Sequence, residues 1–168
     1  TEQYLRNIDL SYVKLGLTDG ALDEVQNLLT RAYEIGVQAA TATNANARDV
    51  LAMEMRGLLD TVRDLSNATD ASGRSIFGGF KVGDPPFTVK ADGSTSYGGD
   101  RGVHTVKISP SLKLQTSIDG SSVFERVPVA DGSGYKSVFS LMNSIIGKLE
   151  VGSGDDLPID DLKSAVGH

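Results

Sequence analysis

The two histidines are the first side chains to consider for chemistry, because histidine acts both as a metal ligand and as a general base near neutral pH. His104 has no Asp, Glu or His two or four residues further along the chain, so a local zinc-binding pair is absent. His168 is the last residue of the sequence. The chain contains no cysteine, which removes thiolate ligands and cysteine nucleophiles. We therefore predict no metal site and no cofactor.

Three short motifs come near known functional patterns without matching them. Ser75 follows Gly73 as in a nucleophile elbow, but Phe77 stands where the G-x-S-x-G pattern needs its last glycine. Gly98–Gly102 lacks the lysine of a phosphate-binding loop, and Gly152–Asp156 lacks the ligand spacing of a calcium loop. We interpret both as turns. The sequence predicts no catalytic residue and hence a protein that is not an enzyme.

Composition and charge narrow the class of protein. The 168 residues suit one domain, and a hydrophobic content of 39% is enough for a core. The net charge of −6 argues against nucleic acid and anionic membrane as partners, since both select clustered Lys and Arg. No apolar run approaches the length of a membrane-spanning helix, about 18 residues.

The elements that must position any site begin with a long predicted helix from Glu2 to about Gln38. Its apolar residues recur at intervals of three and four, which is typical of a helix buried along one narrow seam. Gly16 and the Thr18–Gly20 step weaken the helix and allow a kink. The seam consists of Ile8, Leu15, Leu22 and Leu29, with Leu5, Tyr12, Val25, Ala32 and Ala39 beside them.

A second helix should run back along the first, because only the short polar corner Ala40–Ala45 separates them. Asn46 followed by Asp49 predicts the N-terminal cap of this helix, and Asp70–Gly73 predicts its end. Its apolar seam comprises Leu51, Met55, Leu58, Val62 and Leu65.

The hydrophobic period changes between Arg74 and Pro128, where Asp-Gly and Gly-Gly turns separate short apolar runs. We expect three to five short antiparallel strands that cover one end of the helical rod. The runs are Ser75–Phe77, Phe87–Lys90, Val103–Ile108, Leu112–Thr116 and Val123–Val127.

Two further helices are predicted near the end of the sequence, where they can complete a bundle with the first two. Ser137–Leu149 has one apolar face, and Pro158 stands at the start of a last helix. Asp160 and Asp161 lie in the first turn of that helix, where we expect solvated acids. The fold class is therefore α+β and mainly α: a long antiparallel helical rod with a small antiparallel β domain inserted.

Several of these segments resemble the bacterial flagellin family. The helical signature comprises Ala21-Leu-x-Glu-Val25, Leu29-Thr-Arg31, Glu34-Ile-Gly-Val-Gln38, Asn44, Glu54, Leu58, Leu65 and Asn67. The turn Ser72–Gly79, followed by Pro86-Phe87, Tyr97-x-Gly99-Asp100 and Gly120-x-x-x-Phe124, resembles the hook–filament junction branch of the family, the hook-associated proteins. The resemblance covers nearly the whole chain.

The resemblance implies a core fragment of a longer, secreted protein whose terminal helices are missing. Residues 1–73 and 134–168 would form the helical rod, and residues 74–133 the outer β domain. The implied partners are other flagellar axial proteins, namely a hook-associated junction protein, flagellin and copies of the chain itself in a ring, together with a flagellar export chaperone. By the same resemblance, subunit packing would involve Arg31, Glu34, Ile35, Gln38, Asn44 and Glu54, and the domain-junction turn would comprise Gly73, Phe77, Gly78 and Gly79.

The function implied is a structural subunit that joins hook to filament in the extracellular flagellum. Two alternatives remain open. One is a short filament flagellin, and the other is a surface-displayed glycan-binding homologue. The glycan-binding hypothesis would use Tyr97, Arg101, Lys107 and Lys113 on the β region, although such residues more often lie on solvated strand faces.

Overall fold

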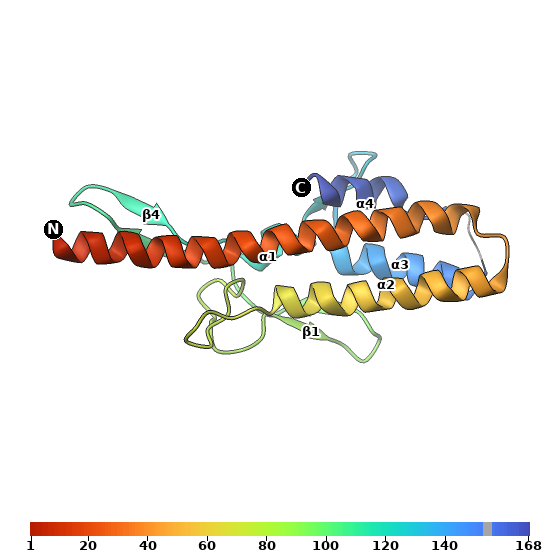
Figure 1. The fold of residues 1–168 in the computed structure, drawn as a ribbon, viewed down its shortest axis with the longest axis horizontal. Coiled ribbons are helices and arrows are strands. Elements are labelled where there is room, and N and C mark those ends of the chain that lie inside the picture. The colour runs from red at the N-terminus through yellow and green to blue at the C-terminus, as the bar shows by residue number, and fades with distance from the viewer. Residues whose placement is uncertain (153–155) are drawn as a thin grey trace.

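The computed structural model describes residues 1–152 and 156–168. Four α-helices account for about half of it, and short strands lie in the region between the second and third helix (Figure 1). Three positions of the predicted Gly152–Asp156 turn lie outside the described residues. The elements are α1 (Glu2–Thr41), α2 (Ala45–Ser66), β1 (Phe87–Val89), β2 (Thr95–Tyr97), β3 (Thr105–Lys107), β4 (Lys113–Gln115), the π-helical turn η1 (Ser121–Glu125), β5 (Val127–Pro128), β6 (Tyr135–Lys136), α3 (Val138–Glu150) and α4 (Ile159–Val166).

Helix α1 is one unbroken helix of 40 residues, about 60 Å long at 1.5 Å per residue. The kink allowed at Gly16 and Gly20 does not form, because the helix continues through both glycines. Glycine in a helix costs only about 1 kcal/mol, and tertiary contacts on either side outweigh that cost. The helix ends at Thr41, and Asn44 then begins the return.

Burial divides α1 into two halves. From Leu22 onward the predicted seam faces the core, and Val25, Leu29, Ala32 and Ala39 are buried. Near the N-terminus the prediction is wrong in part: Leu5 is 63% exposed and Tyr12 74% exposed. The reason is tertiary, since α2 covers only the second half of α1 and the β3–β4 hairpin lies along the first (Figure 1).

Helix α2 returns antiparallel to α1, as predicted, but its two ends differ from the prediction. Asn44, not Asn46, is the N-cap: its side chain accepts a hydrogen bond from the Ala47 amide at 2.8 Å. The helix ends at Ser66, before the predicted stop at Asp70–Gly73. Asn67 ends it and forms two hydrogen bonds to the backbone of Phe87, at 2.8 and 2.9 Å. Hydrogen bonds to Phe87, twenty residues further along the chain, thus fix the end of the helix.

Helices α3 and α4 complete the bundle as expected, with α3 along α2 and α4 along α1. Ser137 caps α3 by accepting the Phe139 and Ser140 amides. Gly36 lies where the helices meet, and a Cβ there would touch the side chains of Ile145 and Ile159. Alanine would fit at ordinary contact distance there, whereas a side chain that extends beyond Cβ would push the helices apart.

The β region consists of three separate two-stranded antiparallel hairpins, β1–β2, β3–β4 and β5–β6. The short antiparallel strands expected here are present as separate pairs, but two of the predicted runs do not form strands. Ser75–Phe77 is a turn with one bridge from Thr69 to Ser75, and Val123–Val127 is largely the π-helical turn η1. The hairpins flank the side of the rod and do not close one end of it (Figure 1).

A cluster of phenylalanines joins the β region to the helices. Phe124 of η1 lies 5.3 Å from Phe77, 5.2 Å from Phe87 and 5.8 Å from Phe139, measured between ring centroids. All four side chains are at most 2% exposed. Phe139 belongs to α3 and the other three lie in the β region, so one hydrophobic core passes through both parts. The division into residues 1–73 with 134–168 and residues 74–133 stays a prediction.

The expectation that Asp161 is a solvated acid is wrong. Asp161 is buried, and its carboxylate accepts the Ala130 amide and the Lys136 ammonium, each at 2.8 Å. These contacts attach the β5–β6 hairpin to α4. The Ala130 amide, followed by the Lys136 ammonium, lowers the pKa of Asp161 below its ordinary value. Its neighbour Asp160 is exposed, as expected.

We predict that Asp161→Asn lowers the free energy of unfolding at pH 7 by about 1–3 kcal/mol, because a charge-assisted contact is lost. The pKa of Asp161 is lower in the folded than in the unfolded chain, so its contribution is present above the unfolded value of 3.8. It disappears as the pH falls through the lower folded value. Urea unfolding at several pH values should show the difference between wild type and variant closing below pH 3.8. Asp160→Asn is the matched control, and an equal effect there would contradict the prediction.

Candidate functional site

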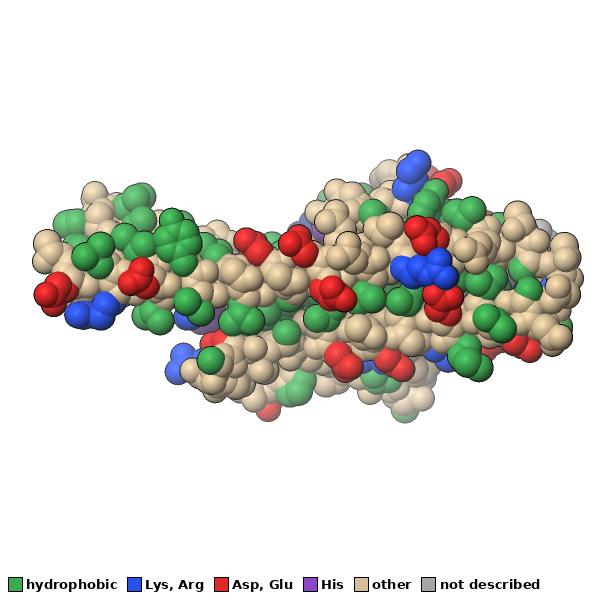
Figure 2. Space-filling model, in the orientation of Figure 1, with side chains coloured by type: hydrophobic (Ala, Val, Ile, Leu, Met, Phe, Trp, Pro, Cys, Tyr) green, Lys and Arg blue, Asp and Glu red, His purple; other side chains and the backbone are tan. Residues whose placement is uncertain are grey.

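A charged cluster joins α1 and α2 on their outer side. Arg31 and Glu54 lie at nearly equal distances along the chain from the corner, so the antiparallel helices bring them together. The Arg31 Nε donates to Glu54 Oε1 at 2.6 Å, and Arg31 Nη1 donates to Glu34 Oε2 at 3.0 Å. Glu34 is three residues from Arg31 and therefore shares its helix face. Figure 2 shows basic side chains flanked by acidic ones where α1 and α2 lie side by side.

This cluster is exposed enough to meet another molecule. The side chains of Arg31, Glu34 and Glu54 are 40%, 54% and 37% exposed. The hydrogen bonds of Glu54 and Glu34 raise the pKa of Arg31 above its ordinary value, so it stays a cation. Exposed ion pairs contribute little to folding because water screens them. The arrangement therefore provides a fixed pattern of charges on a rigid helical face.

Of the other predicted packing residues, two are exposed to solvent and one is buried. Gln38 is exposed on α1, one turn beyond Glu34. Asn44 is exposed too, while its side chain caps α2. Ile35 is fully buried in the core, and its assignment as a subunit-packing residue stays a prediction. Its position on α1 places it on the inner face, which the helical period alone could have indicated.

The predicted domain-junction turn is tightly packed within the β region. Phe77 is fully buried, and Gly78 and Gly79 are buried with it. Gly79 has a φ of +67°, which favours glycine, and a Cβ there would overlap Asp100. Gly73 also has a positive φ, +74°, but lies in open space.

Three residues that the sequence analysis did not connect with this turn hold it in place. The Tyr97 hydroxyl lies 2.9 Å from the Phe77 carbonyl oxygen, and His104 Nε2 lies 2.8 Å from the Gly79 carbonyl oxygen. Asp100 accepts the backbone N–H of the residue after Gly79 at 2.8 Å. The motif Tyr97-x-x-Asp100 was visible in the sequence, but its contact with a turn twenty residues away was not.

Burial raises the pKa of Tyr97 to about 12, so its hydroxyl remains protonated and can donate. The Phe80 and Gly102 backbone N–H groups lower the pKa of Asp100, so its carboxylate remains charged and keeps both bonds. Both groups thus have structural partners within the chain.

The residues considered as candidates for chemistry do not form a common site, and several form hydrogen bonds within the chain. The Ser75 hydroxyl accepts the Phe77 amide, and the Tyr97 hydroxyl donates to a backbone carbonyl oxygen. Lys107 and Lys113 are exposed and pair across β3–β4. Across residues 1–152 and 156–168, no three acidic or histidine side chains lie close enough to hold a metal ion. Within the same residues, no helix has both the length and the apolarity needed to cross a membrane. The outer helical face and the junction turn are therefore the candidate functional features.

Known proteins with similar sequences or structures agree with the fold described above. Residues 1–81 match the bacterial flagellin N-terminal helical region. Flagellar hook-associated protein 3 of Salmonella typhimurium is 29% identical over 144 residues, which are 82% of this chain and 44% of that protein. Flagellin 1 of Proteus mirabilis is 36% identical over 66 residues, 38% of this chain and 18% of that protein. The first 81 residues are thus similar to the N-terminal helical region of bacterial flagellins.

Among the matched proteins, the longer matches are to flagellar hook-associated protein 3. The Escherichia coli protein of that name is 28% identical over 84% of this chain and 46% of its own length. A crystal structure of hook-associated protein 3 from Legionella pneumophila superposes with a TM-score of 0.91, covering 99% of this chain and 84% of that one at 18% identity. Bacillus cereus FlgL gives a TM-score of 0.79 at 22% identity, covering 99% and 76%. This chain spans less than half the length of the curated hook-associated relatives it matches.

Proposed function

We propose that this chain is the core of a structural subunit of the bacterial flagellum, located at the junction between hook and filament. The observation that carries the proposal is the match to hook-associated protein 3 over 82% of the chain. The geometry supports it, since a long helical rod with a patterned charged face suits side-by-side packing of subunits. The match to hook-associated proteins supports a structural role, and we propose that the chain is not an enzyme.

The same proposal covers partners and location. Copies of the chain would pack in a ring, with a hook-associated junction protein on one side and flagellin on the other. A flagellar export chaperone would hold the chain before secretion to the extracellular flagellum. The absence of cysteine suits an unfolded exported chain, because no disulfide has to form outside the cell. The outer charged face of α1 and α2, comprising Arg31, Glu34, Gln38 and Glu54, would contact a neighbouring subunit.

The proposal is tested by locating the protein on cells. An antibody against residues 74–133, detected with gold in the electron microscope, should label only a short zone between hook and filament. A deletion strain should keep its hooks, release unpolymerised flagellin and fail to swim. Label along the whole filament would make the chain a filament flagellin, the function that the Proteus mirabilis match favours. Label over the cell body would favour the glycan-binding hypothesis.

We predict that Glu34→Lys impairs swimming without unfolding the chain. The substitution reverses one charge of the outer face and places it beside Arg31, while Glu34 is 54% exposed and outside the core. Complementation of the deletion strain should give smaller swimming zones than wild type, with the thermal midpoint shifted by less than about 2 °C. Asp84→Lys, an equal reversal at an exposed loop position, should swim normally. Equal swimming of both variants would remove the face from the proposed interface.

A further inference from the structure

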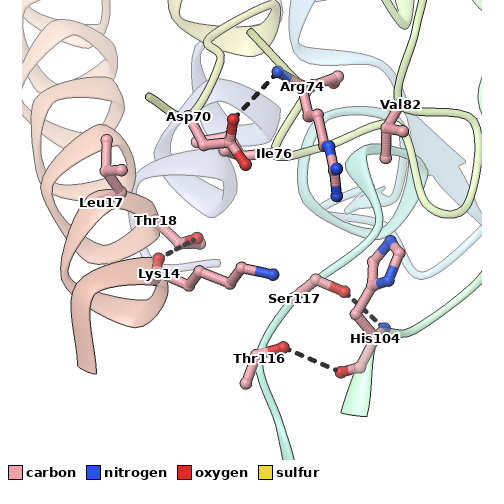
Figure 3. Close-up of a pocket in the computed structure, with 11 residues that line it drawn as sticks. Lys14, Leu17, Thr18, Asp70, Arg74, Ile76, Val82, His104, Thr116 and Ser117 are labelled. Atoms are coloured by element: carbon pink, nitrogen blue, oxygen red, sulfur yellow. Dashed lines mark hydrogen bonds between the residues drawn. The ribbon is translucent and has the colours of Figure 1, made fainter. Parts of the chain in front are cut away.

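A small pocket lies between the middle of α1, the turn that follows α2 and the start of the β3–β4 hairpin (Figure 3). It has a volume of about 90 Å³, and its polar lining includes Lys14, Asp70, Arg74, His104, Thr116 and Ser117. The pocket lies apart from the outer face of α1 and α2. We propose that it binds a carboxylate group, an interaction that does not depend on the proposed junction function.

Two cations enter the pocket from elements far apart in sequence. Lys14 extends from α1, and Arg74 extends from the turn after α2, so that the ammonium and the guanidinium point into the same space (Figure 3). Neither has a carboxylate within 4 Å in the part of the chain that the structure describes, whereas six other Lys and Arg residues there do. Two unneutralised cations side by side repel each other, and an anion between them removes that repulsion.

Asp70 is the one acidic side chain that lines the pocket, and it does not neutralise the pair. Its Oδ1 accepts the backbone N–H groups of Ser72 at 2.8 Å and of Arg74 at 3.1 Å. The Arg74 backbone bond is the main reason that the pKa of Asp70 is lowered, and the charges of Arg74 and Lys14 act in the same direction. The Asp70 carboxylate is hydrogen-bonded to the backbone of the turn and is the one negative charge beside the two cations, Lys14 and Arg74. The pocket therefore keeps a net positive charge.

The remaining polar groups are held in fixed positions and supply a donor. The Ser117 hydroxyl accepts the His104 backbone N–H at 2.8 Å and keeps its own hydrogen for a ligand. The His104 ring is held by the Gly79 carbonyl oxygen at 2.8 Å, and Thr116 bonds to the His104 carbonyl oxygen. A ligand would therefore meet preorganised donors, which lowers the cost of binding.

The charge and the size of the pocket suit a small anion. A volume of about 90 Å³ has room for a carboxylate group. Arg and Lys pair strongly with carboxylate oxygens through charge-assisted hydrogen bonds. The carboxylate can belong to a small organic acid or to an Asp or Glu side chain of a second copy of this acidic chain, whose net charge is −6.

The test is a titration of the ¹⁵N-labelled chain with sodium succinate, followed by amide chemical shifts at constant ionic strength. We expect saturable shifts at Arg74, His104 and Ser117, with a dissociation constant of about 1 mM, the affinity of two or three such bonds. Lys14→Met and Arg74→Met should each weaken binding about tenfold, and Arg74→Lys should restore part of it. Lys90→Met, at an exposed position away from the pocket lining, is the matched control.

Shifts that do not saturate, or that persist unchanged in Lys14→Met and Arg74→Met, would overturn the proposal. Both side chains are outside the core, and well-dispersed spectra of the variants will show that they fold. Sedimentation velocity then separates the two sources of the carboxylate. Self-association that succinate and Lys14→Met both weaken identifies a second copy as the source, whereas a monomer that binds succinate identifies a small acid.

Discussion

Phe124→Ala should be among the most destabilising single substitutions in this chain. The Phe124 ring is fully buried and lies within 6 Å of three other phenylalanine rings, measured between centroids. Removing it loses the burial of a large side chain and leaves a cavity that Phe77, Phe87 and Phe139 cannot fill without moving. The expected cost is about 3–5 kcal/mol, the range for Phe→Ala in cores. For a chain of this size that corresponds to a lower thermal midpoint by about 6–20 °C.

Calorimetry or circular dichroism measures this change directly. Phe80→Ala is the matched control, because Phe80 belongs to the same region but is 61% exposed. Its ring lies beside His104, at 5.1 Å between centroids, and against Gly102. Because most of the ring stays in solvent, the expected cost is less than about 1 kcal/mol. The cluster joins η1 and β1 to α3, so loss of Phe124 should unfold both parts in one transition. Two separate transitions, with the helices unaffected, would show that the β region has an independent core.

Gly79→Ala should cost about 2–5 kcal/mol, far more than its single methyl group suggests. The residue has a φ of +67°, where an L-residue other than glycine pays about 1–2 kcal/mol. The added Cβ would also overlap the backbone carbonyl and the carboxylate of Asp100. Backbone atoms cannot rotate away, so the junction turn must shift, and such overpacking adds about 1–3 kcal/mol.

Comparison with Gly73→Ala separates the cost of backbone strain from the cost of steric overlap with Asp100. Gly73 has nearly the same backbone conformation, with a φ of +74°, but no atom lies within 4 Å of a Cβ built there. It should therefore cost only the conformational strain, about 1–2 kcal/mol. Denaturant unfolding of the two variants side by side is the measurement. Equal losses would mean that Asp100 moves away freely, and the turn would then not be the rigid junction that its packing indicates.

Local signals in the sequence were enough to predict the helices. Apolar spacing indicated α3 within a residue of its observed bounds, and Pro158 indicated the start of α4, because helix formation depends on neighbours within one or two turns. The short corner determined that α2 is antiparallel to α1. The resemblance to the flagellin family came from residues of α1 and α2 and from the glycine turn, and the comparisons confirm it.

Local signals failed wherever a distant segment decides the outcome. The seam of α1 is continuous in sequence, yet Leu5 and Tyr12 are exposed because α2 ends before it reaches them. Asp161 looks like any acid in the first turn of a helix, but the β5–β6 hairpin buries it. Asn67 ends α2 by pairing with Phe87, a contact that no helix-stop pattern contains.

The sequence by itself thus determined the class of protein, the number and direction of the long helices and the positions of the turns, since these depend on local spacing and backbone preference. Tertiary structure alone decided which apolar residues are buried, how the strands pair as three separate hairpins, and which side chains converge. Lys14 and Arg74 illustrate the difference, because sixty residues separate them and only the packing of the turn against α1 brings their charges to one pocket. Convergence of this kind depends on three-dimensional contacts, which a single sequence does not encode in any local pattern.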